Sequence, residues 1–118
     1  LSGNIDDHNK NFSFMMATAG VWHITPAYDF TFSVDTSAPG YINRHCMTIN
    51  NKNADIERAD LLQIAKRYNI KGAESIINKA IEVVSNYAHY AQLANIDEHW
   101  TNKIVEEISY RIGVLNVR

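Results

Sequence analysis

The sequence lacks the cysteine pairs and the long apolar runs that build disulfide-bonded, cysteine-metal and membrane-spanning proteins. Its one cysteine, Cys46, can form neither a disulfide within the chain nor a cysteine zinc cluster. No apolar run approaches the roughly 20 residues that span a bilayer, and the first residues do not resemble a secretion signal. The formal net charge of -2 provides no excess of basic residues for direct contact with nucleic acid. We therefore expect one domain of 118 residues, located in the reducing cytoplasm.

Phosphate-binding loops are also missing. The chain contains no G-x-G-x-x-G sequence, no P-loop and no lysine-bearing strand of the Val-Ala-Ile-Lys type. Any reaction with a nucleotide would therefore need a second lobe that covers the phosphates. We expect the chain alone to be an inactive C-terminal fragment of a longer enzyme, with little or no affinity for ATP.

Residues 4–11 form a dense polar stretch instead. They provide two carboxylates, an imidazole, an amine and three carboxamides, and they run directly into the apolar residues 12–16. Asp6 and Asn11 have the D-x-x-x-x-N spacing of a kinase catalytic loop. In phosphoryl transfer a carboxylate accepts the proton of the acceptor hydroxyl, and a neutral amide oxygen can hold Mg²⁺. Asp6 is the candidate for the first role and Asn11 for the second.

A second metal-binding carboxylate is expected further along the chain. Residues 12–16 and 21–24 are typical of two strands in a β-hairpin, joined by a turn that ends at Gly20. The aromatic content of the first strand predicts burial on both of its faces. Pro26 should end the second strand and direct Asp29 back towards Asp6. Protein kinases also place a hairpin between the catalytic loop and a metal-binding aspartate.

Two segments carry a family resemblance. Residues 3–12 (Gly-Asn-Ile-Asp-Asp-His-Asn-Lys-Asn-Phe) and 22–30 (Trp-His-Ile-Thr-Pro-Ala-Tyr-Asp-Phe) resemble the C-terminal part of HipA-like serine/threonine kinases. These kinases are the toxins of bacterial toxin–antitoxin pairs. The resemblance continues through residues 45–51 and the helical stretch 56–70. Ile5 stands where the family usually has a small polar residue, and Asn51 stands where a glycine is common.

The resemblance implies roles for individual residues and partners. Asp6 would be the catalytic aspartate, while Asn11 and Asp29 would hold Mg²⁺ against ATP. The phosphorylated protein would be an aminoacyl-tRNA synthetase, and a DNA-binding antitoxin would inhibit the enzyme. His8 and Lys10 are further candidates for binding the cofactor. His8 is expected to brace the loop, and Lys10 either neutralises charge on the transferred phosphoryl group or faces solvent.

The expected fold is α+β and mainly α, a protein-kinase-like C-terminal lobe with one β-hairpin followed by about three helices. Residues 1–30 would hold the catalytic loop, the hairpin and the metal-binding aspartate. Residues 31–53 would form an irregular segment in the place of an activation segment, and residues 54–118 a helical scaffold. Apolar spacing predicts one long helix over residues 73–94.

Side chains with cap-forming oxygens mark where the other helices should begin. Asn53 or Asp55 is expected to cap the first helix, and Asp97 the last one, which should end near Gly113. Cys46 has no base near it in the sequence, so we expect it to act as a small apolar residue and not as a nucleophile.

Other functions fit the same polar stretch. The D-x-H-x-x-N order of Asp6, His8 and Asn11 also occurs in kinases of small molecules, of the aminoglycoside and choline type. A metal-dependent hydrolase could use Asp6, Asp7, His8 and Asp29 around two metal ions. The non-catalytic alternative is a helical interaction module in which the polar stretch is vestigial. In the kinase interpretation, Asp7 is expected to accept hydrogen bonds from backbone N–H groups of its own loop.

Overall fold

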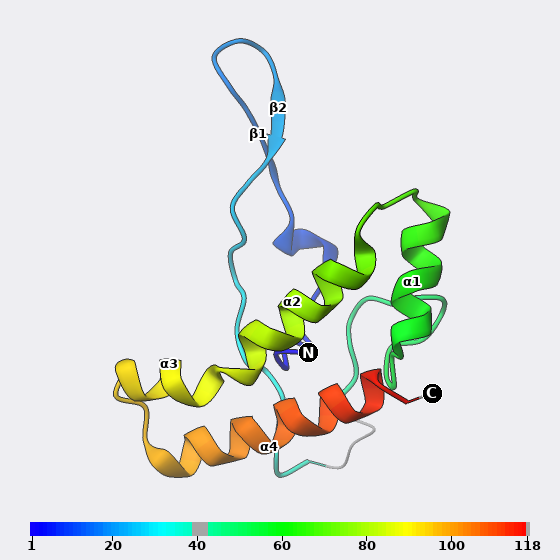
Figure 1. The fold of residues 1–118 in the computed structure, drawn as a ribbon. Helices are drawn as coiled ribbons and strands as arrows, with labels where there is room; N and C mark the ends of the chain where they lie inside the picture. Colours follow the sequence, from blue (N-terminus) through cyan, green and yellow to red (C-terminus); the bar gives the residue numbers. More distant parts are fainter. Residues whose placement is uncertain (39–42, 118) are drawn as a thin grey trace.

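The structure is a computed structural model that describes residues 1–38 and 43–117. Within that part the chain forms a short 3₁₀ turn, η1 (Asn9–Asn11), one antiparallel hairpin and four α-helices (Figure 1). The expected fold class, mainly helical with one β-hairpin, is confirmed. The elements are β1 (Phe14–Met16), β2 (Trp22–Ile24), α1 (Arg58–Arg67), α2 (Ala73–Ser85), α3 (Tyr87–Leu93) and α4 (Glu98–Leu115).

The hairpin forms where the sequence predicts it, with two short strands joined by a turn that ends at Gly20. Phe14 pairs with Ile24, and Met16 pairs with Trp22. In the turn, the backbone N–H of Gly20 donates to the carbonyl of Ala17, and Gly20 has a φ of 77°. This left-handed conformation costs glycine little because it has no Cβ.

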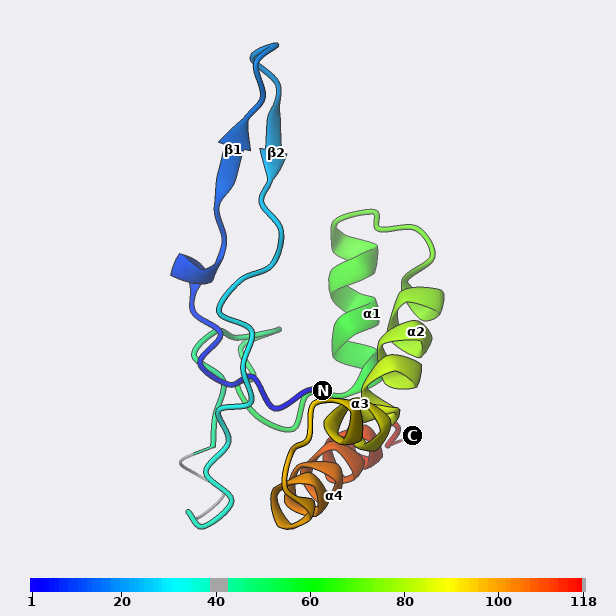
Figure 2. The same cartoon turned by 90° about the vertical axis from the view of Figure 1, so that its left-hand side faces the viewer.

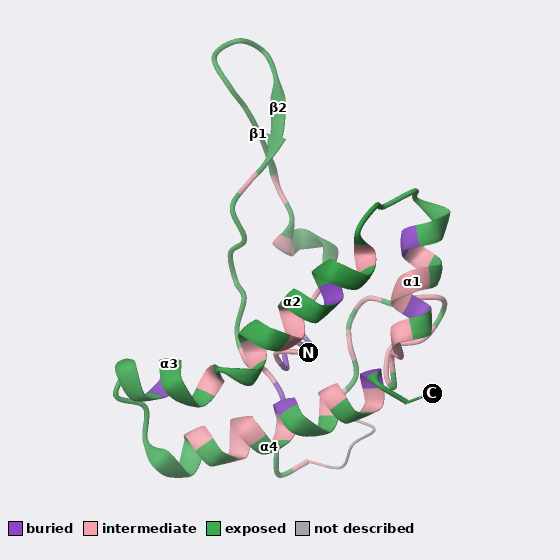
Figure 3. Ribbon diagram, viewed as in Figure 1, coloured by how far each residue is buried: buried purple, intermediate pink, exposed green. Residues whose placement is uncertain are grey.

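The predicted burial of the first strand on both faces is wrong. All residues of β1 and β2 are exposed, with Phe14 65% and Trp22 64% accessible. The reason is that the hairpin projects away from the helices, and no other element of the described chain covers it (Figures 2 and 3). The projection also gives a radius of gyration of 16.0 Å, compared with about 13.5 Å for a compact domain of this length.

The helices pack around α2, which contacts α1, α3 and α4. Each helix contributes an apolar side chain to this small core, in line with the helical spacing of those residues in the sequence. No helix in the described part is both long and apolar enough to cross a bilayer. The buried apolar residues of the helices are Ala65, Ile77, Ala91, Ile108 and Leu115 (Figure 3).

The single helix predicted over residues 73–94 is interrupted. Asn86 ends α2 with φ and ψ of -87° and 11°, and α3 begins at the next residue. The side-chain amide of Asn86 donates to the carbonyl of Glu82, which satisfies one of the free carbonyls at the end of α2. The break raises the number of helices in the described part to four, where about three were expected.

The first helix begins later than predicted, and the last begins where expected. Asp55 has a left-handed φ of 50°, and Glu57 occupies the position before α1. At α4 the carboxylate of Asp97 accepts a hydrogen bond from the backbone N–H of His99 at 2.9 Å, so this predicted cap is confirmed. The helix passes Gly113 and ends at Leu115.

Between β2 and α1 the described residues form turns, bends and one isolated bridge between Ile49 and Lys52. This segment encloses the start of the polar stretch from two sides. On one side the backbone N–H of Ser33 donates to the carbonyl of Gly3, and on the other Cys46 donates to the carbonyl of Ile5. Ile5 is therefore buried between them.

Candidate functional site

Asp6 combines a fixed backbone with an open carboxylate. Its backbone N–H donates to the Ser33 hydroxyl at 3.2 Å, and its carbonyl accepts from the Asn11 side chain at 3.2 Å. The preceding N–H, of Ile5, donates to the same hydroxyl at 2.9 Å. The Asp6 side chain remains 64% exposed. A carboxylate held in this way can receive a proton from a substrate without first giving up a strong internal partner.

Asn11 presents an amide oxygen that has no hydrogen-bond donor. Its Nδ2 group donates to the Asp6 carbonyl, so the Oδ1 atom of the same amide points away from that carbonyl. The Asn11 Oδ1 atom is buried, and no donor in the described residues reaches it. Such an atom costs about 1–3 kcal/mol, which coordination to a cation would offset. Asn11 also borders a pocket of about 480 Å³ between the hairpin base and α2.

The chain after the hairpin returns to the polar stretch through Tyr28. The Tyr28 hydroxyl donates to the carbonyl of Lys10 at 2.9 Å and accepts from the Ser13 hydroxyl at 2.6 Å. Asp29 follows directly, with an exposed side chain and a left-handed φ of 54°. The Tyr28 hydroxyl thus links the residue before Asp29 to the turn that carries Asn11. That the side chains of Asp6, Asn11 and Asp29 meet at one ion stays a prediction.

The two candidates for binding the cofactor differ in their surroundings. His8 Nε2 lies 3.9 Å from Asp6 Oδ1, while His8 Nδ1 is buried without a hydrogen-bond partner in the described part of the chain. This position is compatible with the bracing role expected of His8. The Lys10 side chain is exposed, as in the second of its two expected roles. Contact of either residue with a nucleotide stays a prediction.

Cys46 lies beside the candidate base. Its thiol is exposed, so it does not pack as the small apolar residue that the sequence predicted. The Cys46 Sγ donates to Asp6 Oδ1 at 3.6 Å. Two effects raise the pKa of the Cys46 thiol above its usual value: partial desolvation, which is the larger, and the hydrogen bond to the Asp6 carboxylate. A raised pKa lowers the fraction of thiolate, which is the nucleophilic form of cysteine.

The family model for the HipA-like C-terminal domain matches residues 1–108. The chain belongs to this family. Comparison with curated proteins and with solved structures gave no match. The matched range includes the anchored loop of Asp6 and Asn11, the hairpin, Asp29 and the first three helices. The geometry described above is therefore that of a HipA-like C-terminal domain.

Two departures from the family pattern have structural reasons in this HipA-like domain. Ile5 is only 8% exposed, because the segments around Ser33 and Cys46 close over it, so an apolar side chain suits the position. Asn51 has a left-handed φ of 65°, in the turn between the bridged residues Ile49 and Lys52. Glycine adopts this conformation without strain, and asparagine tolerates it better than most residues.

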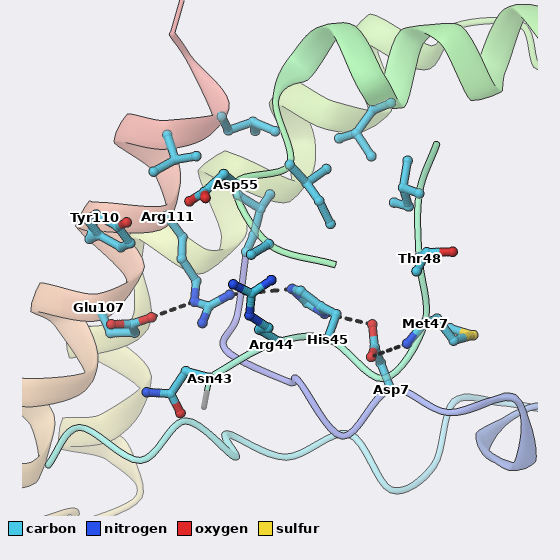
Figure 4. Close-up of a pocket in the computed structure, with 17 residues that line it drawn as sticks. Asp7, Asn43, Arg44, His45, Met47, Thr48, Asp55, Glu107, Tyr110 and Arg111 are labelled. Atoms are coloured by element: carbon cyan, nitrogen blue, oxygen red, sulfur yellow. Dashed lines mark hydrogen bonds and ion pairs between the residues drawn. The ribbon is translucent and has the colours of Figure 1, made fainter. Parts of the chain in front are cut away.

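A series of contacts between polar side chains, which the sequence did not predict, joins the loop of Asp6 and Asp7 to α4 (Figure 4). The Asp7 carboxylate contacts the His45 imidazole, His45 faces Arg111, and Arg111 forms an ion pair with Glu107 at 2.7 Å. All four side chains are at most 24% exposed, and all four line a pocket of about 650 Å³. Asp7 accepts hydrogen bonds from backbone N–H groups of a segment some 40 residues further along the chain, whereas the sequence predicted donors in its own loop.

The geometry does not favour the hydrolase alternative. A site with two metal ions would need several carboxylates or imidazoles facing a common space. No three His, Cys, Asp or Glu side chains gather in this way anywhere in the described residues. Asp7, one of the proposed ligands, instead has both of its oxygens engaged with the His45–Met47 segment.

Proposed function

We propose that this HipA-like C-terminal domain is the catalytic-loop lobe of a protein serine/threonine kinase, the toxin of a toxin–antitoxin pair. The single observation that carries the proposal is the geometry of Asn11. Its Nδ2 group is bonded to the backbone of the candidate base, and its Oδ1 atom is buried without a donor in the described structure. This is the arrangement needed by a residue that couples the position of the base to a bound cation.

The proposed division of labour follows from the surroundings of each side chain. Asp6 orients the acceptor hydroxyl and takes its proton, which its exposed carboxylate can do from a fixed backbone. Asn11 and Asp29 would hold Mg²⁺, which supplies positive charge to neutralise the phosphates of ATP. An amide oxygen and one further carboxylate are both hard ligands that suit this ion.

The nucleotide needs a cover that these residues do not provide. No phosphate-binding loop occurs in the sequence, so we propose that a separate lobe contributes it, as the resemblance implies. Calorimetry on these 118 residues alone should show little or no binding of Mg-ATP. Tight, saturable binding would contradict this part of the proposal.

The proposed partners rest on the family resemblance. They are an aminoacyl-tRNA synthetase as the phosphorylated protein and a DNA-binding antitoxin as the inhibitor. Neither partner leaves a recognisable mark on the side chains of the site. A kinase of small hydroxylated molecules would use the same loop, and substrate profiling with proteins and small alcohols distinguishes the two.

The test uses two substitutions in the enzyme that includes the nucleotide-binding lobe. Asp6→Ala should lower phosphoryl transfer by orders of magnitude. Asp29→Ala should abolish Mg²⁺-dependent nucleotide binding. Asp55→Ala is a matched control, because Asp55 is also exposed and also has a left-handed φ, of 50°, but lies beside α4 (Figure 4). Wild-type turnover in either of the first two variants would refute the assignment.

A further inference from the structure

The two oxygens of Asp7 have separate tasks. Oδ1 accepts the backbone N–H groups of Cys46 and Met47, at 2.8 and 3.2 Å. Oδ2 lies 2.7 Å from the Nδ1 atom of His45. The residue next to the candidate base is therefore held by the segment of residues 45–47, and His45 is its side-chain partner (Figure 4).

The neighbours of His45 determine where its proton lies. A guanidinium group only donates hydrogen bonds, and an ionised carboxylate only accepts them. Arg111 Nη1 lies 3.4 Å from His45 Nε2, so Nε2 must be the unprotonated acceptor. His45 Nδ1 then carries the hydrogen and donates it to Asp7 Oδ2. Glu107 in turn accepts from Arg111 Nε at 2.7 Å and fixes the guanidinium on α4.

We infer that His45 is a positioning residue, which links Asp7 in the catalytic-type loop to Arg111 on α4 and is held as the Nδ1–H tautomer. The His45 side chain is only 17% exposed and that of Asp7 24%, so water competes little for these bonds. The linkage gives the loop a connection to the helical scaffold that is independent of Ser33, which holds the Asp6 backbone from the other side. The consequence for catalysis rests on the proposed kinase function, whereas the tautomer and the linkage do not.

Nitrogen-15 NMR of the imidazole rings tests the linkage without any activity assay. In the wild-type chain, at a pH where the imidazole is neutral, the signals of His45 should be those of the tautomer protonated at Nδ1. In Asp7→Asn the carboxamide oxygen can still accept the two backbone N–H groups, and the new NH₂ group then faces His45 Nδ1. Nδ1 must become an acceptor, so the proton should move to Nε2 and the contact with Arg111 should be lost. Protonation at Nε2 in the wild type, or unchanged His45 signals in Asp7→Asn, would overturn the inference.

Substitutions at His45 separate positioning from general stability. Asparagine at this position keeps a donor near the place of Nδ1, whereas alanine keeps none. In the enzyme that includes the nucleotide-binding lobe, His45→Ala should lower kcat about 10- to 100-fold with little change in the KM for ATP. His45→Asn should recover most of this loss. His89→Ala, which removes an exposed histidine on α3, is the control and should have no effect.

The outcomes distinguish this inference from the proposed function. If Asp6→Ala retains full activity while the tautomer is as described, the kinase assignment fails and the linkage stands. If Asp6→Ala is inactive but His45→Ala matches the wild type in kcat, the kinase assignment stands and the positioning role fails. Equal losses of kcat in His45→Ala and His45→Asn would also refute the positioning role, because the retained donor would then have no effect.

Discussion

Asp60 is a buried carboxylate whose substitution should destabilise the helical scaffold. It is 7% exposed, and its Oδ2 atom accepts from the Lys52 ammonium at 2.8 Å and from the backbone N–H of Glu57 at 3.0 Å. The Asn50 amide donates to the Asp60 backbone carbonyl at 3.1 Å. One carboxylate thus joins the start of α1 to the turn that precedes it.

The expected loss follows from the cap at the start of α1. Asp60 is the third residue of α1, and its carboxylate reaches back to the backbone N–H of Glu57 as one half of a capping box. Losing such a charge-assisted hydrogen bond typically costs about 1–2 kcal/mol. The ion pair with Lys52 adds little, because Lys52 is 42% exposed and solvent screens it. We therefore expect Asp60→Ala to lower the free energy of unfolding by about 1–2 kcal/mol, which corresponds to a melting temperature lower by about 5 °C.

The pH dependence of the difference in unfolding free energy between the wild type and Asp60→Ala provides a second check. The hydrogen bond from Lys52, followed by that from the Glu57 N–H, holds the pKa of Asp60 below its ordinary value of 3.8. A carboxyl group with a lowered pKa in the folded state contributes stability above the unfolded-state pKa, and this contribution is lost as the pH falls through the folded-state pKa. The difference between wild type and Asp60→Ala should therefore be full at about pH 6 and shrink below about pH 4.

Urea denaturation followed by circular dichroism measures both effects. Glu106→Ala, at an exposed carboxylate within α4, should leave the midpoint near that of the wild type. Asp60→Asn keeps one acceptor oxygen without the charge and should fall between the wild type and Asp60→Ala. A loss that stays constant from about pH 6 to about pH 3 would refute the ionic part of this reasoning. A loss below about 0.5 kcal/mol at neutral pH would refute the capping part.

Two further predictions concern the loop and its surroundings. Desolvation and, after it, the Asp6 carboxylate raise the pKa of the Cys46 thiol, so Asp6→Asn should speed alkylation of Cys46 by iodoacetamide at about pH 8; an unchanged rate would show that the two groups do not meet. Gly3→Ala would place a Cβ 2.6 Å from ring atoms of Phe32 at a φ of 77°, so it should destabilise by about 1–3 kcal/mol. Gly20→Ala has the same φ but open space, and an equal loss in both urea titrations would exclude the steric contribution.

The local elements of this fold could be predicted from the sequence where single residues decide them. Pro26 and Gly20 delimit the hairpin, and the Asp97 side chain caps α4 as its position indicates. The interruption at Asn86 could not be predicted, because the apolar spacing continues across it. The burial of the hairpin was predicted wrongly because strand composition reports local preference, whereas burial depends on what lies across from the strand.

Only those residues of the candidate site that lie close together in the sequence could be predicted from their spacing. Asp6 and Asn11 are five residues apart, and the structure joins them directly through the Asn11 amide. The partners that position them come from distant segments: Ser33 lies 27 residues from Asp6, and His45 lies 38 residues from Asp7. No periodicity or motif relates positions so far apart, so the packing of the irregular segment had to be seen before these contacts could be assigned.

The domain has a small apolar core and a loop that is fixed by many hydrogen bonds. This contrast shows which interactions hold the loop in position. Few side chains in the described part are buried, and the largest apolar groups of the hairpin are exposed. The backbone of Asp6 is nevertheless held from three directions, by Ser33, by Asn11 and, through Asp7, by residues 45–47. Positional accuracy at the loop therefore depends on directional hydrogen bonds more than on close packing.

This dependence separates two kinds of variant. Asp60 stabilises the scaffold without touching the loop, so Asp60→Ala should lower the melting temperature and leave kcat at moderate temperature almost unchanged. His45 touches the loop and the scaffold together, so His45→Ala should lower kcat by more than its effect on stability accounts for. If both variants lost activity only in proportion to the fraction of unfolded protein, hydrogen bonding at the loop would have no role beyond holding the fold together.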